Sequence, residues 1–427
     1  MKARNKIYYL GVLLIPACSL FAVASYAQQA ETTEAAEEAL KMSGSGKMKI
    51  AYNSKKHPDK GSLIPALIQL SSAEDDKDKN IDATFTDVSA SVDLAKTVRW
   101  EEDPIKLAVR IAISQQEAKL GKACAEFKNG VLGLQASNFG DPDSNPSSLG
   151  GGPNSAVGRE ALQLSFKQCI NPHCSWAIGL EQAAIFELSK KYKGLLEKAE
   201  KKLAGLKDDE TETAASEAEI KQHKARLRKK PFTRQPAFVV SFRCNYPSSR
   251  GHMCLGLLGR PIQYQDTQTG KTPFPSVGGG IFLGTKIQLV PKQTALKLQG
   301  VIGRGVGGYI ADLASLKNED NTAYVQVNSD DTTNLHIINA GGAHLALEHR
   351  WSSKCRSTLV ISGLSIIKNQ YREKDHYKEG VYGSLSLAYH PTDQFHIGIE
   401  GAAGRKTNVD GQKGYAGGLL MEAGFKF

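Results

Sequence analysis

The sequence predicts an all-β fold, a transmembrane antiparallel β-barrel of about 16 strands with a charged helical insertion in one outer loop. Two patterns support this prediction: apolar and polar residues alternate along many segments, and short connections alternate with long ones. Past the N-terminus, no apolar run approaches the roughly 20 residues of a spanning helix. The hydrophobic fraction of 41% and the mean hydropathy of −0.33 still suit a barrel, because only alternate residues of its strands face lipid.

The first 27 residues have the pattern of a cleavable signal peptide. A basic start (Lys2, Arg4, Lys6) precedes an apolar stretch from Tyr8 to Val23 and the small-x-small site Ser25-Tyr26-Ala27. The alternatives are an uncleaved anchor helix and a lipid anchor at Cys18, where Pro16 replaces the usual small residue. Export together with a barrel predicts location in a bacterial outer membrane. It also makes nucleic acid an improbable partner for a chain with a formal net charge of +10.

Residues 28–46 are acidic and rich in alanine, and they end in Ser-Gly-Ser-Gly. This composition predicts a flexible or helical periplasmic leader. The barrel is then expected to occupy residues 47–427, with a first strand somewhere within 47–70.

From about Ile81 onward, strands are predicted by strict alternation. One strand places apolar side chains on one face and Lys106, Ala108 and Arg110 on the other; the apolar set is Ile105, Leu107, Val109, Ile111 and Ile113. The last strand alternates in the same way, and its apolar face is Leu419, Met421, Ala423, Phe425 and Phe427. A terminal aromatic that closes an alternating strand resembles the signal that outer-membrane barrels present for assembly. We therefore expect Phe425 and Phe427 to carry that signal.

The connections between the predicted strands alternate in length. The short ones are 101–104, 128–130, 170–173, 245–253, 291–293, 352–354 and 390–393. The long ones are 71–80, 140–158, 188–232, 266–276, 306–332, 368–378 and 405–413, whereas 115–117 is short. Outer-membrane barrels are built in this way, with tight periplasmic turns and long outer loops. A soluble β-sandwich or solenoid, the alternative fold, has no reason to alternate its connection lengths.

Residues 188–231 interrupt the β pattern. The stretch is rich in Lys, Glu and Ala, and it places Leu195, Leu196, Leu203 and Leu206 at heptad-like positions. It predicts an amphipathic helix or helical hairpin inserted in an outer loop. Two interpretations stay open, a solvated charged excursion and an element that binds a partner.

The parity of each strand assigns a face to its charged residues. If the apolar set faces lipid, the opposite set lines the lumen. The predicted inward cations are Lys106, Arg110, Arg159, Lys167, Arg243, Lys286, Lys297, Arg350, Arg356 and Lys426. The predicted inward acids are Asp87, Asp93, Glu181, Glu348, Glu400 and Glu422. The cationic excess predicts a pore that concentrates anions, although some of these charges are expected only to brace the wall.

Neither an enzyme nor a metal site is predicted. His336 and His344 are inward by parity, but no G-x-S-x-G motif accompanies them. The run Gly303–Gly308 opens no dinucleotide-binding unit, so no cofactor is expected. The cysteines form no pair of C-x-x-C motifs, so a zinc site is not expected.

Six cysteines remain after Cys18 is removed with the signal peptide, and all lie near short turns. Cys169 and Cys174 flank one turn, and Cys244 and Cys254 flank the next. In an oxidising compartment this predicts two local disulfides, Cys169–Cys174 and Cys244–Cys254. Cys124 and Cys355 are expected to be free or intermolecular, and the alternative is that all six are reduced.

Three sequence patches resemble the DcaP-like trimeric outer-membrane porins. The first contains Asn138–Asp143, Gly151–Asn154 and Arg159; the second is Gly300–Leu313; the third combines Ile397–Glu400, Gly404-Arg405 and Asp410–Gly414. They occur in the family's order over roughly residues 100–427. The chain departs from the family at Glu160-Ala161-Leu162, in the insertion and in its cysteines.

The resemblance implies a homotrimeric 16-stranded porin in outer-membrane lipid. It implies passive diffusion of small, preferentially anionic solutes such as dicarboxylates. The alternative is a non-conducting barrel that acts as a surface adhesin or scaffold through its long loops.

Overall fold

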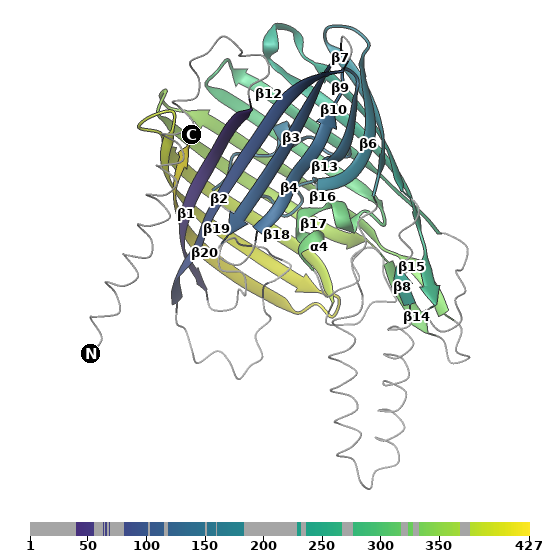
Figure 1. The fold of residues 1–427 in the computed structure, drawn as a ribbon. Helices are drawn as coiled ribbons and strands as arrows, with labels where there is room; N and C mark the ends of the chain where they lie inside the picture. The colour runs from purple at the N-terminus through teal and green to yellow at the C-terminus, as the bar shows by residue number, and fades with distance from the viewer. Residues whose placement is uncertain are drawn as a thin grey trace.

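Most of the described strands form one closed antiparallel barrel (Figure 1). The computed structural model describes residues 40–54, 63, 65, 68, 81–100, 103–114, 118–149, 152–158, 160–182, 229–231, 236–266, 276–316, 323–327, 333–367 and 376–427. Within these residues the barrel has 16 strands, as the sequence predicts. In ring order they are β1 (Lys41–Ser54), β2 (Ile81–Trp100), β3 (Asp103–Ser114), β4 (Ala118–Glu126), β5 (Gly130–Ala136), β6 (Glu160–Cys169), β7 (Cys174–Glu181), β9 (Ala237–Asn245), β10 (Gly251–Ile262), β12 (Ser276–Val290), β13 (Thr294–Arg304), β16 (Asn339–Arg350), β17 (Cys355–Ile367), β18 (Tyr377–Tyr389), β19 (Phe395–Asn408) and β20 (Lys413–Lys426).

The remaining elements are short. Two small antiparallel sheets pair β8 (Lys229–Pro231) with β11 (Tyr264–Asp266), and β14 (Ala323–Val327) with β15 (Thr333–Ile337). The helical turns are η3 (Pro142–Ser144), η4 (Pro247–Ser249), η5 (Gly307–Tyr309) and α4 (Ala311–Ser315). Among the described residues, no helix is long and apolar enough to cross a bilayer.

The ring closes between the first and last strands. β1 pairs with β20 from Ser45↔Lys426 to Asn53↔Gly418. Beyond this ladder, Gly44 N donates to Phe427 O at 2.9 Å and Phe427 N donates to Gly44 O at 3.1 Å. A Cβ on Gly44 would lie 2.5 Å from the Phe427 ring, so glycine is required where that ring lies over β1.

The outer face of the wall is apolar and exposed. Leu162, Ile281 and Leu385 are 53%, 51% and 60% exposed, and their strand neighbours point inward. An apolar surface that encircles a closed barrel would be costly in water, and it is the surface that such barrels present to lipid. The chain is therefore a transmembrane barrel of the outer-membrane type.

The connection lengths alternate as predicted. One end carries short connections, among them 170–173, 291–293 and 351–354. The other end carries the long ones, among them 137–159, 182–236 and 305–338. Short turns mark the periplasmic end of outer-membrane barrels and long loops mark the outer end.

Two predicted boundaries differ from the structure. β1 begins at Lys41, inside the segment expected to be a leader, because pairing with β2 and β20 supplies ladder hydrogen bonds on both sides of a glycine-rich stretch. The predicted helical insertion 188–231 ends in strand β8, which is stabilised by β11. The rest of that insertion and the signal peptide lie outside the described residues.

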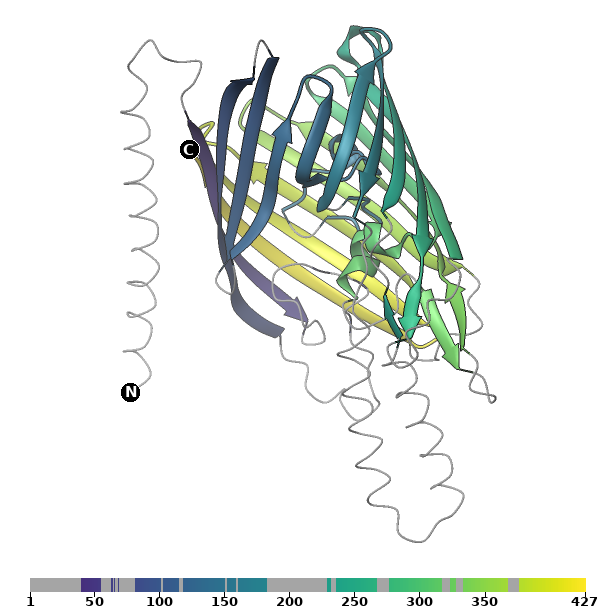
Figure 2. The ribbon, with the colours of Figure 1, turned by 45° about the vertical axis from the view of Figure 1, so that its right-hand side comes forward.

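A connection folds into the barrel, and we call its described residues, 137–149 and 152–158, the inner segment (Figure 2). Phe139 is fully buried and packs edge-on against Phe282 of β12 and Tyr309 of η5, at centroid distances of 6.1 and 5.4 Å. The inner segment lies close to the wall because the wall has a glycine beneath it. A Cβ on Gly284 would lie 2.8 Å from Ser144 Oγ.

Two further pieces of chain pack inside the barrel. Ile310 forms a bridge with Val157, and α4 follows it with Leu313 fully buried. Leu63 and Ile68 pack in a cluster with Ala346, Val360 and Tyr382 on β16, β17 and β18. Segments inside the barrel therefore pack against β12 and against β16, β17 and β18.

Candidate functional site

The inner segment is tied to the wall by three carboxylates, two of them buried (Glu181 and Glu400) and one partly buried (Glu348). Glu181 of β7 accepts from Ser137 Oγ at 2.7 and 2.9 Å and from Asn138 N at 2.9 Å. Glu348 of β16 accepts from Ser147 N at 2.6 Å, and Glu400 of β19 accepts from Leu149 N at 2.7 Å. Hydrogen bonds to a charged acceptor are stronger than neutral ones, especially where water is excluded. These three strands therefore fix the inner segment along its length.

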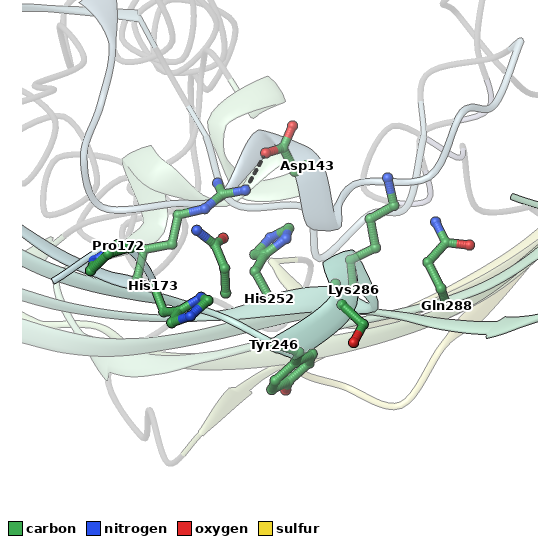
Figure 3. A pocket seen from close by; sticks show the side chains of 11 residues that line it. Asp143, Pro172, His173, Tyr246, His252, Lys286 and Gln288 are labelled. Atoms are coloured by element: carbon green, nitrogen blue, oxygen red, sulfur yellow. Dashed lines mark hydrogen bonds and ion pairs between the residues drawn. The ribbon is translucent and has the colours of Figure 1, made fainter. Parts of the chain in front are cut away.

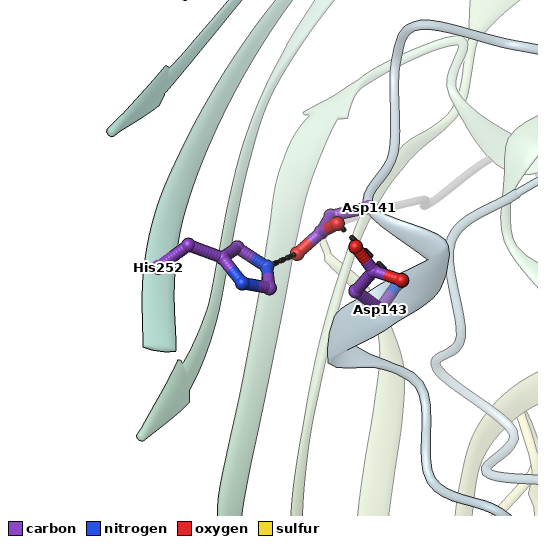
Figure 4. Close-up of side chains that lie close together, drawn as sticks. All are labelled: Asp141, Asp143 and His252. Atoms are coloured by element: carbon purple, nitrogen blue, oxygen red, sulfur yellow. Dashed lines mark hydrogen bonds and ion pairs between the residues drawn. The ribbon is translucent and has the colours of Figure 1, made fainter. Parts of the chain in front are cut away.

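A charged cluster holds η3 against the adjacent part of the wall. Arg243 of β9 contacts Asp141 Oδ1 at 3.3 Å and Asp143 Oδ2 at 2.7 Å. His252 of β10 donates from Nε2 to Asp141 Oδ2 at 2.6 Å (Figure 4). Burial alone would raise the pKa of Asp143, but the hydrogen bond and charge of Arg243 outweigh burial and hold that pKa below its ordinary value.

Asp141, Asp143 and His252 bring three ligand atoms within 4.8 Å of one another, which is close enough to surround a metal ion. Their chemistry favours a different role. Arg243 already contacts both carboxylates, and His252 occupies the second oxygen of Asp141. A cation would have to displace a fixed guanidinium, so the cluster acts as a brace for η3.

A cavity of about 500 Å³ lies between this cluster and the wall. Its lining includes Arg243, Lys286 of β12, His173, Asn245 and Gln288. Figure 3 shows the side chains of His252 and Lys286 extending from the wall on the side where Asp143 lies. Lys286 forms no ion pair with any described residue, so its charge is available to a solute. A second cavity, of about 260 Å³, is lined by Lys167, Trp176 and Cys254.

Four of the predicted inward cations are paired with carboxylates. Arg110 contacts Asp93 at 2.6 Å and Lys106 contacts Glu126 at 3.3 Å, and both cations are 51% exposed. Lys297 is buried and contacts Glu348 at 2.9 Å. Arg243 is the fourth. These pairs match the bracing role that the sequence left open.

The other predicted site residues differ in their surroundings. Lys167 and Arg356, like Lys286, have no ion pair within the part of the chain that the structure describes. Glu400 is 2% exposed and lies beneath Leu149, so it anchors the inner segment. Arg159 falls outside the described residues. Phe425 pairs with Phe395 and Gly46, and Phe427 lies at the barrel seam.

Sequence reasoning missed Asp141, Asp143, His252 and Lys122, which contacts Glu126 at 2.6 Å. His252 and Lys122 stand on strands whose parity could have placed them inward. The two aspartates lie in a connection with no strand pattern. Strand parity assigns a face only to strand residues, so it cannot show which connection folds inward.

The two predicted disulfides are wrong. All six described cysteines are free thiols. Cys169 shares the inner face of β6 with Lys167, whereas Cys174 shares the outer face of β7 with Trp176 and Ile178. Cys244 lies on the outer face of β9 with Phe242, whereas Cys254 is buried inside beside Arg243. Side chains on opposite faces of a sheet cannot be bridged, although a short turn joins their strands.

We expect the difference in ion selectivity between the wild type and Asp143→Asn to depend on pH. At neutral pH the variant removes one negative charge and frees one Arg243 nitrogen, so it should prefer anions more than the wild type does. Since the pKa of Asp143 is lowered, the wild-type carboxylate stays charged until pH falls below its ordinary value of 3.8. The difference in reversal potential should therefore persist through pH 3.8 and be lost only as pH falls below that ordinary value. A difference that is already lost near pH 6 would contradict the Arg243 contact.

Comparisons with known proteins address the fold. No family model matches the sequence, and no curated protein matches it either. Among solved structures, the outer-membrane channel DcaP of Acinetobacter baumannii superposes with a TM-score of 0.68 at 12% identity, covering 92% of this chain and 99% of that one. OmpF of Salmonella typhi gives 0.51 at 8% identity (92% and 98% covered), and OprB of Pseudomonas putida gives 0.50 at 9% (91% and 94% covered). The predicted resemblance is thus confirmed for the fold: the 16-stranded barrel of this chain superposes on DcaP over nearly the whole length of both chains.

Proposed function

We propose that the chain is an outer-membrane diffusion channel for small solutes that favours anions, dicarboxylates among them. The observation that carries this proposal is an asymmetry between the inward charges. Glu181, Glu400 and Glu422 are 0%, 2% and 2% exposed, and the first two are occupied in anchoring the interior. The cations Arg110 and Lys106 are half exposed, and Lys286 faces a cavity.

This asymmetry favours anions for an electrostatic reason. Glu422 is compensated at short range by Lys47 at 3.3 Å, Lys49 at 3.5 Å and His396 at 2.9 Å. The more exposed acids of the described interior are paired as well: Asp143 with Arg243, Asp93 with Arg110, and Glu126 with Lys106 and Lys122. Lys286 has no carboxylate partner among the described residues, so the charge left for a solute in this cavity is cationic. Exposed charge of one sign along a channel raises the local concentration of the opposite ion. Separate cations can each bind one carboxylate of a solute that carries two.

The proposal is tested in a planar bilayer under a KCl gradient. Purified protein should form discrete conducting steps, and its reversal potential should have the sign of an anion-selective channel. Addition of a small dicarboxylate should reduce the chloride current. A folded barrel that never conducts would overturn the proposal and favour the adhesin or scaffold alternative.

The contribution of Lys286 is tested by its neutral variant. Lys286→Gln removes a cation that faces the cavity and has no ion-pair partner among the described residues, so anion preference should fall. Lys354→Gln is the matched control, because it removes the same charge from an exposed turn outside the lumen. The reversal potential of Lys286→Gln should shift toward zero, whereas that of Lys354→Gln should not. Equal shifts in both variants would show that net charge, not placement, sets the preference.

We also propose that the channel is a homotrimer, following the resemblance to trimeric porins. Chemical crosslinking in native membranes, followed by gel electrophoresis of heated and unheated samples, should give a ladder that ends at three subunits. A ladder that stops at the monomer would overturn this part of the proposal alone.

A further inference from the structure

Two of the six cysteines face each other across neighbouring strands. Cys174 is the first residue of β7 and Cys244 lies near the end of β9, and the strand register pairs them directly. Both lie on the outer face of the wall, next to Trp176 and Phe242, which the register also pairs. The two thiols are within hydrogen-bonding reach of each other.

The local ladder places this pair at a position suited to a crosslink. The adjacent pair, His173 and Asn245, is joined by a backbone hydrogen bond of 2.8 Å from Asn245 N to His173 O. Hydrogen-bonded and non-hydrogen-bonded pairs alternate along an antiparallel ladder, so Cys174 and Cys244 form a non-hydrogen-bonded pair with Cα atoms about 4.5 Å apart. That separation is within the range of about 4.4–6.8 Å that disulfides span.

The surroundings leave the pair open to a reagent from the aqueous side. Trp176 and Phe166 form an aromatic contact with ring centroids 5.8 Å apart, and Phe242 is 40% exposed beside them. Aromatic groups of this kind mark the edge of the lipid layer in barrels. The cysteines lie two residues nearer to the short turns than Trp176 and Phe242, and each is only half-buried.

We propose that Cys174 and Cys244 form a disulfide that joins β7 to β9, a covalent modification of the barrel wall. The oxidant is a protein or small molecule that carries an exchangeable disulfide. The thiolate of one cysteine attacks the oxidant disulfide, forms a mixed disulfide and releases one oxidant thiol. The second cysteine loses its proton and attacks the mixed disulfide, which yields the Cys174–Cys244 bond and the second oxidant thiol. Two protein thiols are thus oxidised, and one oxidant disulfide is reduced to a dithiol.

The crosslink would join two neighbouring strands that are connected by a long stretch of chain. The connection from β7 to β9 runs over residues 182–236, more than any other connection between consecutive barrel strands. The cost of closing a loop rises with its length, so a crosslink across a long connection stabilises more than one across a tight turn. The disulfide would fix the β7–β9 register during assembly.

Peptide mapping without reduction tests the proposal on the full-length protein, isolated from outer membranes in the presence of an alkylating reagent. We expect a linked pair of peptides that contain Cys174 and Cys244, with Cys169, Cys254, Cys124 and Cys355 alkylated. The linked pair should disappear in Cys174→Ser and in Cys244→Ser, and in each variant the remaining thiol should become alkylated. Cys169→Ser and Cys254→Ser are the matched controls, and both should keep the link.

A second measurement covers the case in which either serine variant fails to assemble. Wild-type protein is treated with diamide, a thiol oxidant, and its heat unfolding is compared before and after reduction with dithiothreitol. Reduction should lower the unfolding temperature of the diamide-treated wild type and leave unchanged that of wild-type protein whose thiols were reduced and alkylated before the diamide treatment. The proposal is refuted if mapping recovers the 169–174 or 244–254 pair, or if Cys174 and Cys244 stay alkylatable after diamide. Conductance does not enter this test, so it is independent of the channel proposal.

Discussion

Lys297→Met is expected to lower the free energy of unfolding by about 3–5 kcal/mol, the usual cost of removing one partner of a buried ion pair. Lys297 and Glu348 are 6% and 14% exposed and lie 2.9 Å apart. Lys297 Nζ also donates to the carbonyl oxygen of Asn145 at 2.7 Å. The variant would leave the partly buried Glu348 carboxylate with Ser147 N as its remaining close donor in the described structure. Urea unfolding of the protein in lipid vesicles, followed by tryptophan fluorescence, measures the change.

The matched control is Lys106→Met, which removes the same side chain from the exposed pair with Glu126. Lys106 is 51% exposed, so water screens its pair and the loss should be at most about 1 kcal/mol. The double variant Lys297→Met/Glu348→Leu removes both buried charges, so it should be less destabilised than the sum of its single variants. Equal losses at Lys297 and Lys106 would contradict the difference in burial on which this prediction depends.

The second large effect concerns the attachment of the inner segment. Glu400→Ala removes the acceptor of Leu149 N and of the Tyr382 hydroxyl, which lies at 3.2 Å. It leaves a buried backbone donor without its partner, so the chain near Leu149 should detach from the wall. Leu149 keeps a hydrogen bond from Lys49 Nζ to its carbonyl oxygen at 3.0 Å and a small apolar cluster with Ala51 and Leu420, but neither supplies an acceptor for its backbone N–H. We expect the detached chain to sample the lumen and to cause step-like fluctuations of the open-channel current.

Single-channel recordings at one fixed voltage test this expectation. Glu400→Gln keeps an oxygen acceptor for Leu149 N, so its current should stay close to that of the wild type. Glu126→Ala removes a half-buried carboxylate outside the inner segment, so its open-channel current should also be free of step-like fluctuations. Steady current from a folded Glu400→Ala barrel would show that Glu400 does not hold the inner segment in place.

The barrel itself was predictable from the chain because its evidence is local. Alternation along residues 105–113 and 419–427 reports two faces with a period of two, and that period survives any arrangement of the loops. The order of short and long connections then indicates the number of strands and the two ends. The start of β1 was not predicted because its glycines weaken the alternation. Its position depends instead on pairing with β2 and β20.

The interior was predictable only in part. Parity placed Lys286, Arg243 and Lys297 on the inner face. It could not show which of these cations forms an ion pair with a carboxylate and which does not. Arg243 is neutralised by aspartates about a hundred residues earlier in the chain, and Lys297 by Glu348 from the next strand in the ring. Such pairings depend on which connection folds inward, and that choice is made by packing around Phe139 and by glycines such as Gly284.

The cysteines show the same division between local and tertiary information. The sequence by itself determined that Cys169, Cys174, Cys244 and Cys254 lie near short turns, since strand and turn periodicity are local properties of the chain. Only the tertiary structure decided their neighbours, because the partner of a strand residue is set by register with another strand. Register placed Cys174 opposite Cys244 across the connection 182–236, and it placed the turn-flanking pairs on opposite faces. The physical reason is that side chains of a strand alternate between faces, so closeness in sequence does not bring two thiols to the same side of the wall.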